Sequence, residues 1–240
     1  MNRDTHLKTI VLAMFFWVLA SWMPSALAQQ TIFNVPSADV TPKGHLYEEH
    51  ESQFRPWNPD SFWNLTHYNA LGVGHRTEVD VTLLNVSAPA SHKVSLGLGF
   101  KSYVPLLVKK YREREFKLTY GELIPIALQR QGQDIGHWEY SHLSGRLPKL
   151  NTRLTAGVSN GSDLIFGRNV VCFIGGYEHP VTKKFSLIGD WFSGTHNLGF
   201  FIPGFSYSLP KDYVLFLGYQ IPNTARCGHS GIVFEVSRVF

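Results

Sequence analysis

The chain has 240 residues, of which 44% are hydrophobic and 17% are charged, and its formal net charge is +4. A balance so near zero, without a run of more than two consecutive Lys or Arg residues, argues against a nucleic-acid partner. Only Cys172 and Cys227 are present, which excludes a scaffold built on disulfides and leaves open whether these two thiols pair.

Residues 1–28 have the pattern of a secretory signal peptide that is cleaved. Arg3 and Lys8 form a basic start, residues 10–22 are apolar, and residues 26–28 (Ala-Leu-Ala) form a small-residue cleavage site. The apolar run is shorter than the roughly 20 residues that a membrane-spanning helix needs, so we expect cleavage rather than anchoring. Cleavage leaves 20 of the 22 basic and 17 of the 18 acidic residues.

Residues 29–44 come before the first predicted strand and lack a clean alternation of polar and apolar residues. Two placements are open for this segment. It is either a leader outside the folded domain, which we take as the default, or a segment that folds into the interior of that domain.

From residue 45 onward, short turns recur at intervals of 28 to 39 residues, and each interval has room for two strands and one opposing loop. Six such hairpins predict about 12 strands. The turns are expected at residues 74–76, 108–110, 147–149, 181–184 and 209–212.

Side chains alternate between two faces along these segments, as they do in a strand. In residues 93–101, Val94, Leu96, Leu98 and Phe100 face one way and Lys93, Ser95 and Lys101 the other. A membrane barrel and a soluble sandwich both show one apolar and one polar face. Strands of about ten residues, aromatic residues near strand ends and charged residues in mid-strand favour the barrel. Because lipid cannot satisfy an open sheet edge, such a sheet must close on itself.

The last strand, residues 230–240, places Ile232, Phe234, Val236 and Phe240 on one face and ends the chain on an aromatic residue. It resembles the final strand of bacterial outer-membrane β-barrels, in which the terminal Phe acts as an assembly signal. The resemblance implies an all-β, closed antiparallel transmembrane barrel of about 12 strands in the outer membrane of a Gram-negative-type bacterium, with short turns on the periplasmic side. Residues 45–240 would form the barrel, and residues 29–44 a periplasmic segment or a lumen plug. Outer-membrane lipid and the assembly machinery, which reads the C-terminal strand, would be its partners.

The polar strand faces predict which residues line the lumen: Glu78, Asp80, Lys93, Lys101, Lys117, Glu139, Arg153, Asp190 and Glu235. Both signs are present, and neither dominates. A ring of one sign would predict ion selectivity. The mixture instead predicts either a weakly selective aqueous path or an internal network of salt bridges. We therefore expect a passive channel for small hydrophilic solutes, with a non-conducting structural barrel as one alternative.

A second alternative is a lipid hydrolase. His142 and Ser144 are two residues apart, so both lie on one strand face, close enough for an imidazole to activate a hydroxyl. Asn151 could orient the histidine. The pair resembles the His-x-Ser of outer-membrane phospholipase A and lipid A deacylase, and parity with Trp138 and Tyr140 predicts that both residues face lipid. The chain departs from that pattern at Gly145, where those families have Asn.

No cofactor is expected, because the sequence has no phosphate-binding glycine loop and no Cys-x-x-Cys pair. Residues 48–51 (Glu-Glu-His-Glu) invite a metal interpretation. They lack the second histidine of the metalloprotease signature, so we expect a polar strand and no metal site there.

Overall fold

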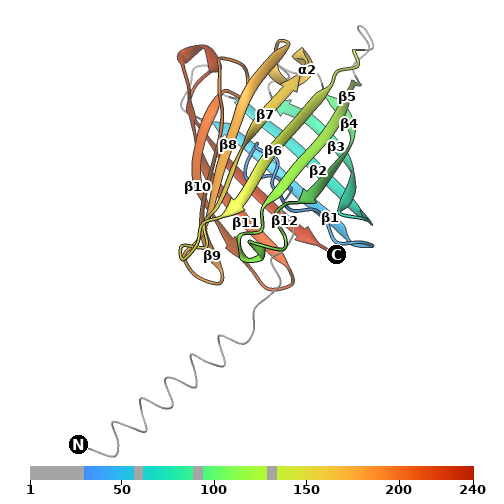
Figure 1. The fold of residues 1–240 in the computed structure, drawn as a ribbon. Helices are drawn as coiled ribbons and strands as arrows, with labels where there is room; N and C mark the ends of the chain where they lie inside the picture. Colours follow the sequence, from blue (N-terminus) through green and yellow to red (C-terminus); the bar gives the residue numbers. More distant parts are fainter. Residues whose placement is uncertain (1–29, 57–61, 89–93, 129–133) are drawn as a thin grey trace, which may run out of the picture.

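The structure is a computed structural model that describes residues 30–56, 62–88, 94–128 and 134–240. Twelve antiparallel strands form one closed barrel, in which each strand pairs with its neighbours in the sequence and β1 pairs with β12 (Figure 1). The strands are β1 (Leu46–Arg55), β2 (Phe62–Gly74), β3 (Thr77–Ala88), β4 (Ser95–Pro105), β5 (Lys117–Ala127), β6 (Trp138–Arg146), β7 (Arg153–Gly161), β8 (Val170–Pro180), β9 (Phe185–Phe192), β10 (Phe200–Ser208), β11 (Tyr213–Pro222) and β12 (Gly231–Val239). The predicted fold class and strand number are confirmed.

The ring closes between the first and last strands. Tyr47 pairs with Val239 in an antiparallel register, and the backbones of Leu46 and Phe240 exchange two hydrogen bonds of 3.3 and 2.8 Å. β1 therefore begins and β12 ends at the same end of the barrel. We call it the turn end, because the short strand connections lie there, and we call the opposite end the loop end.

The turn end has the tight connections that the sequence predicts. Two of them place consecutive residues in the left-handed region, His75 and Arg76 after β2, and Lys211 and Asp212 before β11. Two successive positive φ angles match the right-handed twist of the flanking strands. A longer connection, residues 106–116, carries the short helix η1 (Arg112–Arg114). At the loop end lie α2 (Asp163–Phe166) and η2 (Ala225–Cys227).

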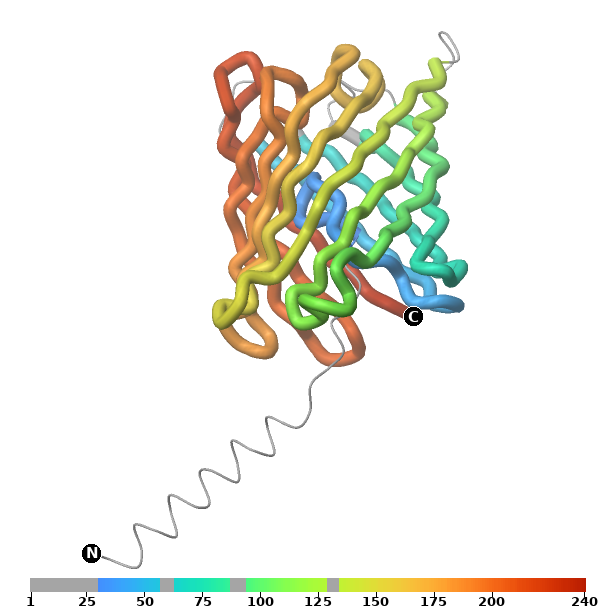
Figure 2. Tube along the Cα trace, in the orientation of Figure 1, coloured from blue at the N-terminus to red at the C-terminus, as the bar shows by residue number. Residues whose placement is uncertain are grey.

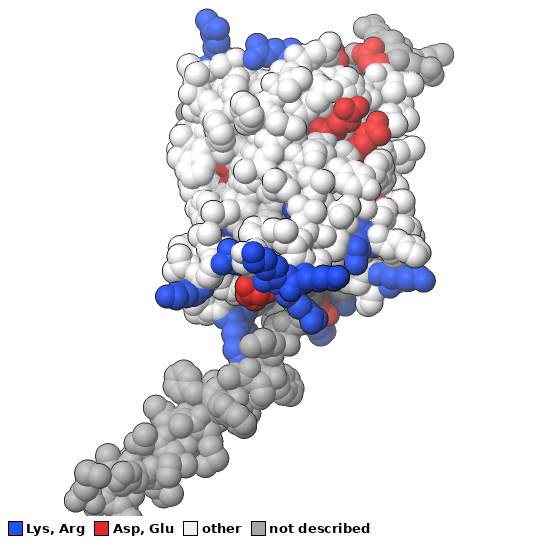
Figure 3. Space-filling view, in the orientation of Figure 1, with Lys and Arg blue, Asp and Glu red and all other residues white. Residues whose placement is uncertain are grey.

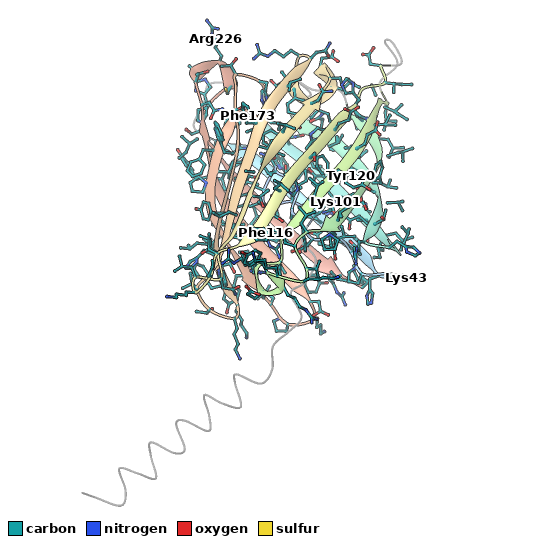
Figure 4. The ribbon with its side chains drawn as sticks, viewed as in Figure 1. Lys43, Lys101, Phe116, Tyr120, Phe173 and Arg226 are labelled. Atoms are coloured by element: carbon teal, nitrogen blue, oxygen red, sulfur yellow. The ribbon has the colours of Figure 1, made fainter. Side chains whose placement is uncertain are left out.

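The outer wall is apolar and the basic residues lie at its borders. Val171 is 77% exposed and Phe173 66%, and Leu98 and Tyr120 also point outward. Figure 3 shows a largely uncharged wall with Lys and Arg gathered at the turn end, and Figure 4 shows Tyr120 and Phe173 on that wall. The exposed surface is apolar on most strands, which matches contact with acyl chains, whereas the outer face of β1 and β2 also carries Glu48, His50 and His67.

On β6 the predicted faces are wrong. Trp138, Tyr140, His142 and Ser144 are buried, and Glu139 is exposed. The inversion has a steric reason, because an added side chain at Gly121 of the neighbouring β5 would collide with the Tyr140 ring. Gly121 therefore leaves room inside the barrel for large aromatic side chains, and Trp138 packs at 6.4 Å from Phe166 between ring centroids.

Residues 30–41 lie inside the barrel, and residues 42–44 are exposed at the turn end. Figure 2 shows residues 30–41, in deep blue, enclosed by the strands. Ile32, Phe33, Val35 and Ser37 are fully buried. Residues 30–37 form a small hairpin, with a bridge between Thr31 and Pro36 and a hydrogen bond of 2.8 Å from the Ile32 amide to the Val35 carbonyl. We call residues 30–37 the lumen hairpin.

Cys172 and Cys227 are both buried, and both are free thiols. Within the described part of the chain, no helix is long and apolar enough to cross a membrane. The predicted signal peptide lies outside the described residues.

Candidate functional site

One carboxylate on the barrel wall holds the tip of the lumen hairpin. Asp190 of β9 accepts hydrogen bonds at its Oδ2 from the backbone amides of Phe33, Asn34 and Val35, at 3.0, 2.7 and 2.6 Å. Three convergent amides form a small anion-binding concavity, so the carboxylate replaces the intrachain partners that the turn cannot supply.

Glycines in the wall make space for the apolar residues of the hairpin. A Cβ added at Gly204 would lie 2.6 Å from Cζ of Phe33, and one at Gly218 would lie 2.7 Å from the same atom. A Cβ at Gly176 would collide with Cδ1 of Ile32. Real Cβ atoms do not approach so closely, and packing at this density transmits small volume changes. The wall is therefore shaped for these two side chains.

Polar contacts on the opposite side of the lumen complete the attachment. Lys101 of β4 is fully buried, forms a salt bridge of 3.0 Å with Glu78 of β3, and donates a hydrogen bond of 3.0 Å to the Gln30 carbonyl. Glu78 accepts a hydrogen bond of 2.6 Å from the Thr41 amide. Figure 4 labels Lys101 in the interior.

Asp39 anchors the segment between the hairpin and β1. It forms salt bridges with Arg153 at 2.7 Å and with Lys117 at 3.0 Å. Burial opposes its ionisation, but the Arg153 guanidinium and the Lys117 ammonium outweigh burial and hold the pKa of Asp39 well below its usual range.

A second group of carboxylates forms no salt bridge within the described part of the chain. Glu51 of β1 stands directly opposite Glu235 of β12 in the strand register, and both are buried. The charged groups that act most strongly on Glu235 are Glu49, Glu51 and Asp190. Both carboxylate oxygens of Glu235, and Oε2 of Glu51, lack a hydrogen-bond partner among the described residues. Like charges directly opposite in a sheet are unfavourable.

A cavity of about 270 Å³ lies between this carboxylate group and the loop end. Asn34, at the tip of the lumen hairpin, lines it from below, and the exposed Asn197 and Arg226 line it at the loop end. Its polar lining residues are Asn34, Glu51, Gln53, Arg55, Asn64, Thr66, Tyr68, Asn85, Asn197 and Arg226, and its other lining residues include Leu84, Trp138, Ile165 and Leu198. The cavity and the lumen hairpin together are the candidate functional site.

The structure places most of the predicted lumen residues inside the barrel: Glu78, Asp80, Lys101, Arg153, Asp190 and Glu235 are buried, and Lys117 contacts Asp39. Glu139 is the exception, because it faces outward beside Asn160, whose amide lies 3.4 Å from its carboxylate. Lys93 lies outside the described residues.

The predicted hydrolase residues do not face lipid. His142 is 1% exposed and stacks against Tyr140, and Ser144 is buried on the same inner face. Asn151 is exposed in the turn after β6, where its carbonyl accepts a hydrogen bond from Arg146. Neither ring nitrogen of His142 has a hydrogen-bond partner in the described part of the chain, so no catalytic triad is assembled.

Sequence reasoning missed Asn34, Asp39 and the cavity residues Gln53, Asn64 and Arg55. The only local signal for the cavity was the alternating polar face of β1, Glu49, Glu51 and Gln53. The sequence alone predicts a polar strand there and indicates no partner for its polar face. Among the described residues, no group of three or more His, Cys, Asp and Glu side chains is placed to hold a metal ion.

Comparisons with known proteins give structural likeness only. No protein-family model and no curated protein sequence matches the chain. An outer membrane channel from Pseudomonas putida F1 is similar in structure, with 12% identity and a TM-score of 0.48, over 86% of this chain and 100% of that one. The translocator domain of the autotransporter NalP from Neisseria meningitidis has 9% identity and a TM-score of 0.41, over 82% and 87% of the two chains. The strand pairing and the apolar wall carry the conclusion on architecture. The chain is a closed barrel of the outer-membrane type.

Proposed function

We propose that the protein is an outer-membrane channel for small hydrophilic solutes, in which the lumen hairpin forms the constriction. The observation that carries the proposal is the polar cavity at the loop end, which ends on the hairpin tip at Asn34. A barrel of 12 strands is wider than one that side chains alone fill, and much narrower than the large porins. Here the lumen hairpin fills part of this wider lumen.

The proposed orientation of the barrel in the membrane is based on the positions of its turn end and its loop end. The turn end faces the periplasm and the loop end faces the outside, so solutes reach the cavity first and the hairpin afterwards. The outer membrane of a Gram-negative-type bacterium is the compartment, outer-membrane lipid surrounds the wall, and the assembly machinery reads the strand that ends in Phe240.

The tip of the hairpin is held by polar contacts as well as by the packed Phe33 ring, and the polar contacts exchange with water at little net free energy. To release the tip, the hydrogen bonds to weaken are the three that backbone amides donate to Asp190. Displacement of the tip would join the cavity to the turn end of the lumen.

Planar bilayer recording on the chain without residues 1–28 tests the proposal. We expect discrete conductance steps from the unmodified protein, and larger steps or longer open times from Asp190→Ala. Glu48→Ala is the matched control, because Glu48 is a carboxylate on the outer face of β1. Absence of conductance in all three proteins, each shown to be folded and inserted, would contradict a channel and leave a non-conducting barrel.

A further inference from the structure

Acidic side chains lie at the inner end of the cavity at the loop end, and basic side chains lie at its outer end. Glu51 is at its inner end, next to Glu235, and Arg55 and Arg226 are at its outer end. Arg55 and Glu51 share the inner face of β1 and are four residues apart, which places their Cα atoms about 13 Å from each other. The two side chains reach into the same cavity from positions along one strand.

At the inner end of the cavity, one carboxylate oxygen has no hydrogen-bond donor among the described residues. Gln53 donates a hydrogen bond of 2.7 Å to Oε1 of Glu51, but Oε2 has no partner among the described residues, although Glu51 is only 1% exposed. The charged form of a buried carboxyl group is strongly unfavourable without a compensating cation, and Glu235, directly opposite, supplies none.

A second, independent acceptor faces the same space. Asn64 of β2 lines the cavity, is 7% exposed, and its Oδ1 also lacks a partner in the described part of the chain. Two buried acceptors that are not satisfied by the protein call for a ligand that brings N–H donors with positive charge.

The cavity wall suits an ammonium group in a further way. Tyr68 and Trp138 both line it. The Trp138 ring is fixed by a hydrogen bond of 2.8 Å from its Nε1 to Ser159. Aromatic faces attract ammonium ions, and more strongly where water is excluded.

The outer end of the cavity favours a negatively charged group. Arg226 is exposed at the rim, where Figure 4 labels it, and the guanidinium of Arg55 lies 5.0 Å from the centre of the Phe200 ring. Guanidinium groups bind carboxylates through paired hydrogen bonds.

We propose that this cavity binds a small zwitterion, with its ammonium group at Glu51 and Asn64 and its carboxylate at Arg226 on the rim. The inference names the solute class of the proposed channel and to that extent rests on the proposed function. A solute with only one of the two charged groups would interact with only one end of the cavity.

Isothermal titration of the detergent-solubilised chain without residues 1–28 tests the site. The probes are 6-aminohexanoate, which carries both charges, hexylammonium and hexanoate, which carry one each, and glucose, which carries none. We expect 6-aminohexanoate to bind at least about tenfold more tightly than any of the other three, because each added charged hydrogen bond is worth about that much. Equal or tighter binding of any of these three overturns the proposal.

Three variants separate the site from a general effect of charge. Glu51→Gln should weaken 6-aminohexanoate binding about tenfold or more, and Arg226→Ala, which changes an exposed rim residue, by several-fold. Glu48→Gln, on the outer face of the same strand, should leave it unchanged. Heat-modifiable migration in gels shows that each variant retains a folded barrel. Unchanged binding in folded Glu51→Gln together with unchanged binding in Arg226→Ala overturns the proposal.

The two proposals fail separately. Conductance without zwitterion binding leaves the channel and removes this site. Binding without conductance leaves the site and removes the channel.

Discussion

The lumen has two regions built from the same twelve strands. Towards the turn end, opposite charges meet: Lys101 faces Glu78, and Arg153 and Lys117 face Asp39. Around the hairpin tip and above it, Glu51 faces Glu235, and three of the acceptor atoms there have no donor among the described residues: Oε2 of Glu51 and both carboxylate oxygens of Glu235. The first region is held together by ion pairs, whereas the second surrounds a cavity. The difference teaches that an interior stabilises the fold where its polar groups are paired, and is free to bind a ligand where they are not.

The largest effect is expected from removing the aromatic ring that packs at the hairpin tip. Phe33→Ala deletes a fully buried side chain between Gly204 and Gly218 and should weaken hairpin docking by about 3–5 kcal/mol. Hydrogen exchange of the Asn34 and Val35 amides should accelerate at least about a hundredfold. Unchanged exchange would mean that polar contacts alone hold the tip.

The reverse change, filling the space, should have a smaller effect. Gly218→Val places a side chain where the Phe33 ring lies, and overpacking of this kind costs about 1–3 kcal/mol. Gly175→Val is the matched control, because a Cβ there meets only the Thr155 carbonyl, at 3.5 Å. Limited proteolysis of residues 30–44 measures the result, and equal cleavage of both variants would contradict the steric argument.

The ion pairs of Asp39 give a prediction about pH. The pKa of Asp39 is lowered in the folded protein, so its contribution is complete above the ordinary carboxyl pKa and is lost only as the pH falls through the lower, folded value. Asp39→Asn should therefore weaken docking by the same amount at pH 7 and at pH 5, about 1.5 kcal/mol, as measured by proteolytic protection of residues 30–44. A smaller difference between the two proteins at pH 5 than at pH 7 would contradict this account.

The smallest expected effect lies beside the cavity. His196 is buried in the loop after β9, its Nε2 donates to the Ser193 carbonyl at 2.7 Å, and its Nδ1 accepts from the Leu198 amide at 3.2 Å. Burial lowers the pKa of His196, so the neutral form is favoured and its contribution is lost as the pH falls below the ordinary histidine value.

Protonation of Nδ1 removes the bond to Leu198, which lines the cavity. Exchange of the Leu198 amide, corrected for intrinsic rates, should accelerate a few-fold between pH 7.5 and pH 5.5, about 1 kcal/mol or less. Equal protection at the two pH values would show that the loop is held by other contacts.

The strands could be predicted from the sequence because polar and apolar residues alternate within each strand. Val79 and Val81 alternate with Glu78 and Asp80, and the structure exposes the valines and buries the acids. The prediction failed on β6, where the inner face holds Trp138 and Tyr140. Hydrophobicity alone assigns such residues to lipid, and only Gly121 on the neighbouring strand shows that they have room inside.

The candidate site could be predicted only in part. The charged residues of the lumen were visible as polar positions in strands, but their partners were not. Asp190 lies more than 150 residues from the amides that it binds, and no local pattern connects them. The placement of residues 29–44 was left open for the same reason: this segment has no strand periodicity, and its contacts depend on glycines far along the chain.

The shape of the lumen hairpin also determines how it could leave. Its tip, around Asn34, lies deepest in the barrel, and both Gln30 and Ala38 lie nearer the turn end, beside Lys101 and Lys117. The segment is therefore doubled back on itself, and both arms extend from the tip towards the turn end. If the hairpin leaves the lumen as proposed, it can withdraw towards the turn end without opening the seam between β1 and β12.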